Sequence, residues 1–315
     1  MINIAVVGTG IIGASHLSAI SHSNSCRLCA VCDINETSAA AAAGKYHVPY
    51  FLDYRDIPQK TSADAVILNL PHWLHCEATV FFLEQGLHVL VEKPMANSLE
   101  ECRRMQNAAE RSGKKLAVGH LQRFVPANRM VKDIVASGQL GRLCMVTEFR
   151  TIDYFVQNRP KWFLDKKLAG GGIVMNYGAH ALDKLYYILQ RRPEQIRAVT
   201  GNCKNDASIE GHAQIFAEFS CGVTASVTFS GYSNAGYETV YYFTEGALKV
   251  VDTYQLYQRV GREWEAVQIP GTANAMELQL EEFCKLIRSE DSEMPTGDYG
   301  ADVIAAIECI YKENC

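Results

Sequence analysis

Short apolar runs alternate with segments of helical spacing over about the first 121 residues. Uninterrupted apolar runs are typical of strands that are buried on both faces of a parallel sheet. We expect such strands at 2–7, 27–33, 50–52, 64–70, 88–92 and 115–120. Helices are expected between and after them, at 12–22, 36–45, 74–85, 98–111 and 126–136. Residues 1–121 are therefore predicted to form an α/β domain with a doubly wound parallel sheet.

Beyond residue 141 apolar and polar positions alternate over longer stretches, which is the pattern of antiparallel strands with one covered face. These strands are expected at 142–152, 195–203, 212–219, 223–230, 237–243, 246–251, 254–260 and 263–268. Ser220-Cys221-Gly222 predicts a hairpin turn between two of them. Helices are expected at 179–190, 276–288 and 299–313. Residues 122–315 are therefore predicted to be an α+β domain built on one open, mainly antiparallel sheet.

The second sheet carries apolar and aromatic side chains that need a cover. Either helices of the same subunit cover them or a second subunit does. We expect association through the sheet, as a homodimer or homotetramer. The side chains on which this expectation rests are Phe216, Phe219, Val227, Phe229, Tyr241 and Phe243.

The length of 315 residues suffices for two domains with separate cores. We expect no nucleic-acid partner, because the formal net charge is −5 and no block of Lys and Arg is present to neutralise phosphates. The sequence shows neither an apolar run of membrane-helix length nor a secretory signal at its start. We therefore expect a cytoplasmic protein without a membrane partner.

Eleven cysteines raise the question of disulfides or a metal site. In the cytoplasm thiols remain reduced. Cys26, Cys29 and Cys32 have the spacing of part of an iron–sulfur motif, but on a strand Cys29 would face away from the other two. We expect small buried thiols here and no metal.

The first apolar strand runs into Gly8-Thr9-Gly10-Ile11-Ile12-Gly13, and the second ends at Asp33. This is the order of a dinucleotide-binding βαβ unit, which predicts a Rossmann domain. Gly8 allows the tight turn, Gly10 lets a pyrophosphate approach the helix N-terminus, and Gly13 lets the helix pack on the strand. We expect this loop and Asp33 to contact the cofactor.

Asp33 also favours one cofactor over another. Its carboxylate can accept hydrogen bonds from the adenosine ribose and would repel the additional phosphate of NADP. Ile34 and Asn35 bring no positive charge to offset that repulsion. We expect NAD rather than NADP. The alternative is a solvated acid at the end of a strand.

Candidate ligand-binding residues follow the fourth strand, because ligands of open parallel sheets bind at the carboxyl ends of the strands. Asn69-Leu70-Pro71 and His75 are expected to contact the cofactor, and His72 is a candidate for the substrate. Packing at the start of a helix is the alternative for both histidines.

Glu92-Lys93 follows the fifth strand. Beside a nicotinamide, Lys93 is able to give a proton to a carbonyl or, with a lowered pKa, to take one from an alcohol. A solvated charge is the more common role of a lysine at a strand end. After the sixth strand, Gln122 is expected to contact the cofactor. Arg123 has a planar fork that suits two oxygens of a substrate or of an internal carboxylate.

A run of three glycines, Gly170-Gly171-Gly172, precedes Asn176, His180 and Asp183. The glycines allow close approach of the backbone to a ligand or a sharp turn. In a helix, Asn176 and His180 share a face. A histidine can relay a proton near neutral pH, and Asp183 is placed to orient it. A buried structural histidine is the alternative.

These motifs together resemble the glucose-fructose oxidoreductase, inositol dehydrogenase and MocA (Gfo/Idh/MocA) family over nearly the whole chain. The motifs are GTGIIGASH, Asp33, the Asn-x-Pro-x-x-x-His turn at 69–75, Glu92-Lys93-Pro94, Gln122-Arg123-Phe124, the triple-glycine segment through Asp183, and Pro295-Thr296-Gly297-Asp298. The resemblance implies that Lys93 and His180 are the proton-transfer pair. It also implies a polyhydroxylated substrate, which is a sugar, an inositol or a sugar derivative.

Members of the family often have Asp where this chain has Asn176. An amide can orient His180 but adds no charge that would favour the imidazolium. We therefore assign the acid/base role to Lys93, and to His180 the binding and polarisation of the substrate oxygen. The residues that we expect to contact the substrate are Lys93, Arg123, Tyr154, Trp162, Asn176, Tyr177 and His180, with Asp165 and Tyr237 as further candidates.

The sequence thus predicts an NAD-dependent oxidoreductase that transfers a hydride between the nicotinamide and a hydroxyl or carbonyl group. Two alternatives stay open. One is an NAD-using epimerase or eliminase with no net redox change, and the other is a nucleotide-sensing protein that has lost catalysis.

Overall fold

The computed structural model describes residues 1–271 and 274–312. The chain divides into two compact units. The first unit comprises Met1–His120 and Asn274–Ile304, and the second comprises Leu121–Ala273 and Ala305–Cys315. The segment Asn274–Ile304 lies in the first unit, whereas the sequence-based division places it in the second domain. Each unit is described separately below.

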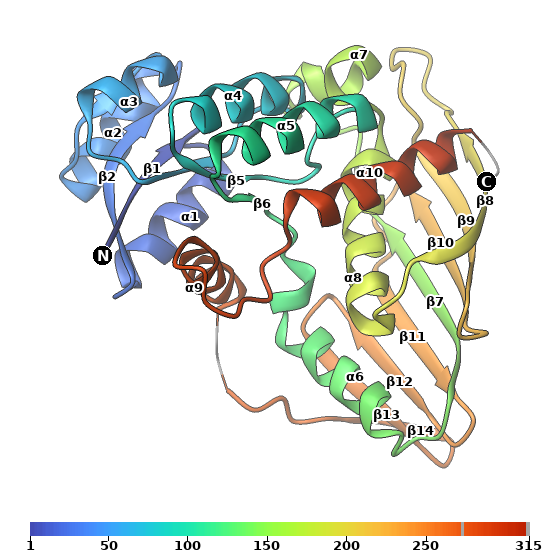
Figure 1. The fold of residues 1–315 in the computed structure, drawn as a ribbon. Helices are drawn as coiled ribbons and strands as arrows, with labels where there is room; N and C mark the ends of the chain where they lie inside the picture. The colour runs from blue at the N-terminus through green and yellow to red at the C-terminus, as the bar shows by residue number, and fades with distance from the viewer. Residues whose placement is uncertain (272–273, 313–315) are drawn as a thin grey trace. The chain divides into compact units, whose positions relative to one another are not determined.

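A six-stranded parallel sheet forms the centre of the first unit, as expected. Its strand order, β3-β2-β1-β4-β5-β6, is that of a dinucleotide-binding doubly wound sheet (Figure 1). The strands are β1 (Ile2–Val7), β2 (Cys26–Cys32), β3 (Tyr50–Phe51), β4 (Ala65–Leu68), β5 (His88–Val91) and β6 (Leu116–Val118). Every residue of β4 is buried, which agrees with the prediction from its uninterrupted apolar run.

The helices of this sheet begin and end within two residues of the expected positions. They are α1 (Ile11–His22), α2 (Glu36–Tyr46), α4 (His72–Glu84) and α5 (Leu99–Ser112), and a short helix, α3 (Ile57–Lys60), was not expected. Ser98 caps α5 by accepting the Glu101 N–H at 3.2 Å. Glu101 in turn accepts the N–H of Asn97, the residue before the N-cap, at 2.9 Å.

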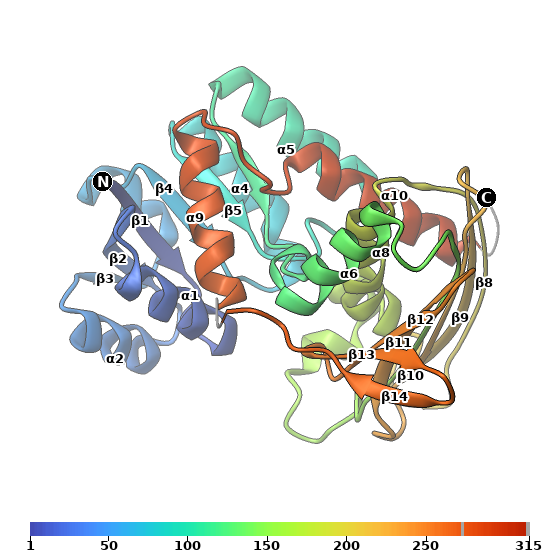
Figure 2. The same cartoon turned by 90° about the horizontal axis from the view of Figure 1, so that it is seen from below.

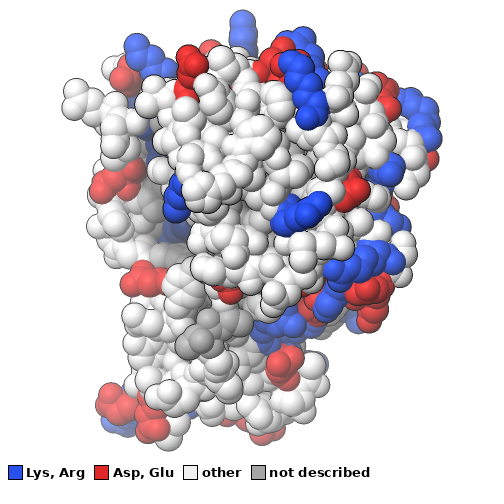
Figure 3. Space-filling model, turned by 90° about the vertical axis from the view of Figure 1, so that its left-hand side faces the viewer, with Lys and Arg blue, Asp and Glu red and all other residues white. Residues whose placement is uncertain are grey.

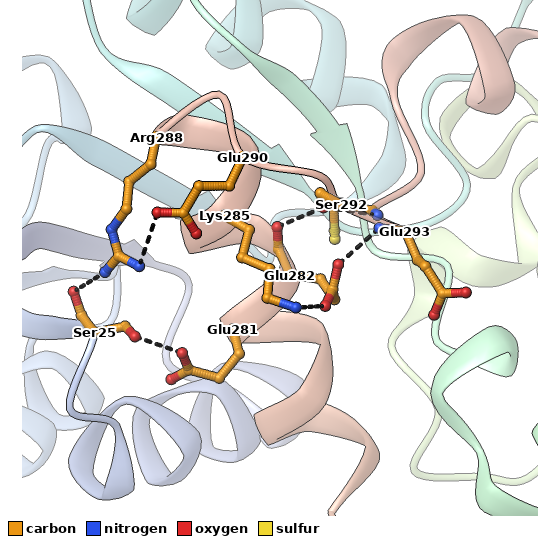
Figure 4. Close-up of polar contacts among 9 residues, drawn as sticks. Ser25, Glu281, Glu282, Lys285, Arg288, Glu290, Ser292 and Glu293 are labelled. Carbon is orange, nitrogen blue, oxygen red and sulfur yellow. Dashed lines mark hydrogen bonds and ion pairs between the residues drawn. The ribbon is translucent and has the colours of Figure 1, made fainter.

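Helix α9 (Ala275–Ile287) packs against α1 and belongs to the first unit. Figure 4 shows its polar contacts, in which the Ser25 hydroxyl donates to Glu281 and Arg288 donates to the Ser25 carbonyl at 3.1 Å. Glu282 accepts from Lys285 at 2.5 Å and from the Glu293 N–H at 2.7 Å. These bonds hold α9 and the turn after it within the first unit.

The segment after α9 extends the edge of the same sheet. The Val118 N–H donates to the Pro295 carbonyl at 2.9 Å, and Thr296 forms a bridge with Ala117. A Cβ on Gly300 would lie 2.6 Å from a Val118 methyl group, so this position requires glycine. Helix α10 (Gly297–Tyr311) therefore begins against β6; residue 313, the last of the expected helix, lies outside the described residues.

An eight-stranded sheet forms the second unit, in the order β14-β13-β12-β11-β7-β10-β9-β8. The strands are β7 (Leu143–Thr151), β8 (Pro193–Gly201), β9 (His212–Phe219), β10 (Thr224–Ser230), β11 (Tyr237–Phe243), β12 (Ala247–Val251), β13 (Gln255–Val260) and β14 (Glu263–Ala266). Only β7 and β10 pair in parallel, so the open sheet is mainly antiparallel, as expected. Gly222 makes the β9–β10 hairpin turn with φ +78°.

Helices α6 (Pro126–Ser137) and α8 (Ala179–Leu189) lie over one face of this sheet, and no helix of the described residues covers the other (Figures 1 and 2). Most of the side chains expected at a subunit interface are on the covered face. The buried ones are Phe219, Val227, Phe229, Tyr241 and Phe243. For these five the expectation was wrong, because the alternation of each strand turns them towards the helices.

The uncovered face carries a different set of large apolar side chains. Phe149 is 43% exposed, Phe216 40%, Met145 40% and Tyr242 38%. Tyr242 pairs with Met145 across neighbouring strands, and Phe216 stands two strands away from Phe149. Only Phe216 belongs to the expected set.

The three clustered cysteines carry free thiols. Cys26 and Cys32 are buried, and the Cys26 thiol lies beside that of Cys284 of α9. Burial raises the pKa of Cys29 to about 11 and that of Cys32 to about 12, so both remain protonated at neutral pH. They act as small packing residues.

Charged side chains of both signs are scattered over the face drawn in Figure 3, with wide uncharged areas between them. Within the described residues, no helix combines the length and apolar character that crossing a bilayer requires.

Candidate active site

In the glycine loop of the first unit, close packing excludes a side chain at two of the glycines, whereas the third faces open space. A Cβ on Gly8, where φ is +87°, would lie 2.3 Å from the Asn69 carbonyl oxygen, and one on Gly13 would lie 2.0 Å from the Gly8 carbonyl oxygen. A Cβ on Gly10 would meet no described protein atom within 4 Å. Gly10 thus leaves the N-terminus of α1 accessible, as a pyrophosphate requires.

Asp33 lies against the same loop. Its carboxylate accepts the Thr9 N–H at 2.8 Å and the Thr9 hydroxyl at 2.9 Å. The Asn35 N–H donates to the other carboxylate oxygen at 2.9 Å. Ile11 is 90% exposed at the start of α1, with Ile12 beside it. The structure therefore brings the expected dinucleotide residues together at one end of β1 and β2.

The turn after β4 is connected to the residues after β5 through His75. The Asn69 amide donates to the Gly8 carbonyl at 3.3 Å. His75 is fully buried, and its ring nitrogens lie 2.8 Å from the Leu70 carbonyl and 2.9 Å from the Pro94 carbonyl. Burial lowers the pKa of His75. Both ring nitrogens of His75 are therefore engaged by backbone carbonyls, so the ring positions two loops and offers no nitrogen to a cofactor. Pro71 is the N-cap residue of α4.

Glu92 anchors the segment that carries Lys93. It accepts a hydrogen bond from the Lys93 N–H at 3.1 Å, and its other oxygen lies 2.9 Å from the His16 ring of α1. Burial opposes ionisation of Glu92, but the contacts with His16 and Lys93 outweigh it and lower the pKa. A Cβ on Gly119 would lie 2.8 Å from the Glu92 carboxylate, so the position directly after β6 favours glycine. Lys93 directly follows β5.

Gln122 and Arg123 serve the interior of the second unit. The Gln122 N–H donates to Asp183 at 3.2 Å, and its side-chain oxygen accepts from Asn128 at 3.1 Å. Arg123 pairs with Asp183 at 3.3 Å, and the Asp183 side chain is fully buried. The internal carboxylate that pairs with Arg123 is thus Asp183, which also accepts the Gln122 N–H. These internal partners leave Gln122 and Arg123 outside the set of proposed ligand contacts.

The triple-glycine segment leads into a π-helix, Val174–Gly178, and then into α8. Glu210 anchors its start by accepting the N–H groups of Gly172 and Val174, each at 2.9 Å, and the Tyr311 hydroxyl at 2.9 Å. A Cβ on Gly171 would lie 1.8 Å from the Tyr311 hydroxyl oxygen, and one on Gly172 would lie 2.1 Å from the Glu210 carbonyl oxygen. The absence of side chains at Gly171 and Gly172 therefore allows Tyr311 and Glu210 to approach the backbone of this segment. π-Helical turns often occur at functional sites.

Four of the expected substrate residues gather at the π-helix. The ring of Tyr177 lies 6.1 Å from that of Tyr154 and 6.3 Å from that of His180. Burial raises the pKa of Tyr154 to about 12, and the neighbouring Asn176 side chain opposes that rise in part. Tyr154 is fully buried, and its side chain lies beside Asn176.

Two further candidates lie on the segment between β7 and the glycines. Trp162 stacks on Phe163 at 3.7 Å in the short helix Lys161–Leu164, and Asp165 caps the helix that follows, α7 (Lys166–Ala169). Arg159 donates to the Tyr154 carbonyl and lies over the Tyr154 ring, 4.0 Å from its centroid. Arg159 therefore connects this segment to Tyr154, the neighbour of Asn176.

Sequence reasoning missed four residues that shape this part of the second unit. They are Arg150, Lys184, Glu210 and Tyr311. Lys184 lies one turn after His180 and pairs with Glu148 at 2.6 Å, with both side chains buried. Its only signal in the sequence is a lysine in an otherwise apolar helical stretch. Glu210 and Tyr311 give no local signal, because their partners lie 38 and 101 residues away.

Comparisons with known proteins agree with this arrangement. Residues 2–120 match the model of the oxidoreductase family with an NAD-binding Rossmann fold, and residues 128–249 match the GFO/IDH/MocA C-terminal domain. The 1,5-anhydro-D-fructose reductase of Ensifer adhaerens is 29% identical over 79% of this chain and 77% of its own length.

A second relative is the 1-carboxy-3-chloro-3,4-dihydroxycyclohexa-1,5-diene dehydrogenase of Comamonas testosteroni, which is 34% identical. That alignment covers 58% of this chain and 46% of the relative. The crystal structure of aldose-aldose oxidoreductase from Caulobacter crescentus, complexed with glycerol, has a TM-score of 0.90 at 22% identity. It covers 99% of this chain and 97% of that one, and it shows the shared fold. With both family domains matched in order, the chain belongs to the GFO/IDH/MocA oxidoreductase family.

Proposed function

We propose that this protein is an NAD-dependent dehydrogenase that transfers a hydride between the nicotinamide and a hydroxyl or carbonyl group of a sugar, an inositol or a sugar derivative. The observation that carries the proposal is the position of Lys93 directly after β5, at the edge where open parallel sheets bind ligands. The family supports it, and so do the two relatives, which are named a dehydrogenase and a reductase.

The first unit fits NAD at the glycine loop. Gly10 leaves room at the N-terminus of α1, where a pyrophosphate is stabilised by backbone N–H groups. The Asp33 carboxylate beside Thr9 suits a ribose and disfavours the additional phosphate of NADP. We propose cofactor contacts from Gly8, Thr9, Gly10, Ile11, Ile12, Gly13, Asp33, Asn69, Leu70, Pro71, Glu92 and Lys93. His75 acts as a positioning residue.

In the proposed chemistry, Lys93 of the first unit is the proton acceptor and His180 of the second unit polarises the reacting oxygen. NAD, when bound, accepts the hydride. Lys93 takes the proton of the reacting hydroxyl group, and His180 hydrogen-bonds the same oxygen and polarises it. Asn176 orients the histidine as a neutral amide, and Tyr154 supports Asn176. Tyr177 and Trp162 are the proposed contacts with the rest of the substrate.

The substitution Lys93→Met tests the acid/base role. We expect hydride transfer to fall by about 10²- to 10⁴-fold, because a positioned proton acceptor contributes that much. The measurement is stopped-flow absorbance of the reduced cofactor on the best substrate of a sugar and polyol screen. Lys60→Met, at an exposed position, is the matched control. An unchanged rate for Lys93→Met would remove the lysine from its role.

The same screen separates the proposed dehydrogenase from its alternatives. Substrate conversion without release of NADH would indicate an epimerase or eliminase. The name of the Comamonas dehydrogenase describes a substrate with a carboxyl group and two hydroxyl groups. Carboxylated polyols therefore belong in the screen beside neutral ones.

We also propose that a second copy of the chain covers the uncovered face of the eight-stranded sheet, giving a homodimer or homotetramer. Phe149, Phe216, Met145 and Tyr242 supply an apolar surface there. Charges of both signs border it, such as Arg197 and Glu218, whose nearest atoms are 3.8 Å apart. A face that carries both signs is able to complement itself about a twofold axis.

A reducing compartment, the cytoplasm, is the proposed location. Two exposed cysteines, Cys203 and Cys221, carry free thiols and support this location, whereas Cys309 is disulfide-bonded. Exposed thiols persist where the glutathione pool keeps them reduced.

A further inference from the structure

Arg150, at the end of β7, lies between two tyrosine rings. Its guanidinium carbon is 4.2 Å from the centroid of Tyr177 and 4.5 Å from that of Tyr237. Aromatic faces stabilise a guanidinium through its flat sides and leave the N–H groups at its edge directed outwards. Such a guanidinium is held in place and can still bind two oxygens in its plane.

The charge of Arg150 is not neutralised within residues 1–271 and 274–312. No carboxylate there pairs with it, and its buried Nε has no hydrogen-bond partner. The nearest acid on its own strand face, Glu148, is taken by Lys184 at 2.6 Å. The Tyr237 hydroxyl accepts from the same lysine at 2.9 Å, so it offers Arg150 only its ring.

A second cation adds to the positive charge. Arg159 lies over the ring of Tyr154, 4.0 Å from its centroid, and the Tyr154 ring is 6.1 Å from that of Tyr177. Arg159 is occupied by the Tyr154 carbonyl, which leaves Arg150 as the guanidinium with available N–H groups. One aromatic ring, Tyr177, separates it from His180.

We propose that Arg150 binds a carboxylate of the substrate, so that the enzyme acts on acidic polyols such as sugar acids. The inference rests on the proposed function, because it places the reacting hydroxyl at His180 and the carboxylate at the other side of Tyr177. A single planar fork matches the two oxygens of a carboxylate. A phosphate group presents more charge and more acceptors than one guanidinium satisfies.

Matched substrates test the proposal, since glucose and glucuronate, or galactose and galacturonate, differ only in the terminal group. We expect kcat/KM for NAD reduction to be at least about tenfold higher for the acids, as a hydrogen bond to a charged group provides. Arg150→Met should lower kcat/KM for the acids by about 10- to 100-fold, mainly through KM, and change the neutral sugars by less than about threefold. Arg150→Lys should retain part of the preference.

Three results would overturn the proposal: a wild-type preference for the neutral sugars, an equal loss on both classes in Arg150→Met, or a stronger preference for glucose 6-phosphate than for glucuronate. Arg111→Met, at an exposed position of α5, is the charge-matched control. NADH binding and the melting temperature of each variant show whether it is folded.

Failure of the proposed function gives a different pattern. In that case the wild type reduces NAD with no member of the panel. Calorimetric titration of the enzyme–NADH complex with glucuronate and glucose then decides the anion site directly. Tighter binding of glucuronate that is lost in Arg150→Met supports the site without turnover, and equal binding of the two sugars rejects it.

Discussion

His88, the first residue of β5, shows how one neutral imidazole can make folding depend on pH. Its Nδ1 accepts the Lys115 N–H at 2.9 Å. Burial, with the charges of Lys114 and Lys115, lowers the pKa of His88 to about 4 from an ordinary value of 6.5. The unfolded chain therefore binds a proton at a higher pH than the folded chain. The stability that His88 contributes is present above pH 6.5 and is lost as the pH falls towards 4.

The substitution His88→Asn should weaken this dependence, because the Asn side-chain oxygen can accept the same N–H but cannot take up a proton. We expect the urea midpoint to fall less between pH 7 and pH 4.5 in the variant than in the wild type. Urea unfolding at several pH values measures this, with exposed His47→Asn as control. Parallel pH curves for His88→Asn and the wild type would contradict the prediction.

The same scale shows where residue chemistry alone misleads. Gln122, Arg123 and His75 follow strands of the parallel sheet, where ligands bind, and each has a side chain suited to binding. The structure engages all three internally, with Asn128, Asp183 and backbone carbonyls. Arg123 and Asp183 are 60 residues apart, and a sequence without coordinates does not show that they meet.

At the scale of elements, the sequence predicted most of the fold. Uninterrupted apolar runs and period-two alternation identify strands because burial on one or both faces dictates them. The π-helix Val174–Gly178 was missed, since its extra residue per turn leaves no distinct apolar period. The short α7 was missed as well, because four residues are too few for a periodic pattern.

Glu210 connects the π-helix to the rest of the second unit, which leads to a prediction for this element. Glu210→Gln replaces one acceptor oxygen by an amide N–H that faces backbone donors. We expect a loss of about 1–3 kcal/mol in the free energy of unfolding, as for a buried donor left unsatisfied, and a lower kcat because His180 follows this turn. Urea unfolding and steady-state kinetics measure the two effects.

Two further variants calibrate that result. Tyr311→Phe removes one donor to Glu210 and the acceptor of the Met175 N–H but leaves the bonds from Gly172 and Val174 to Glu210, so its effect should be smaller. Glu100→Gln, at an exposed position in the first turn of α5, controls for the loss of charge. Wild-type stability and kcat in Glu210→Gln would show that the turn holds its shape without the carboxylate.

For the whole molecule, the proposed second copy gives a prediction of mass. The wild type should elute with a mass of two or four times 35.0 kDa, and Phe149→Arg should shift it towards the monomer, because a charge would be buried without a partner. Size-exclusion chromatography with light scattering at micromolar concentration is the measurement. Leu52→Arg, at an exposed apolar position of the first unit, is the control. A monomeric wild type would reject the second copy.

The route of the chain between its two units has a consequence for biosynthesis. The first unit is left after His120 and completed only from Asn274 onwards, so the ribosome makes all the strands of the second sheet in the interval. At roughly 5–20 residues per second, the nascent nucleotide-binding half waits on the order of ten seconds for α9. During that time the face of α1 that packs against α9, and the edge of β6 that pairs with Thr296, lack their cover and stay open to contacts with other chains.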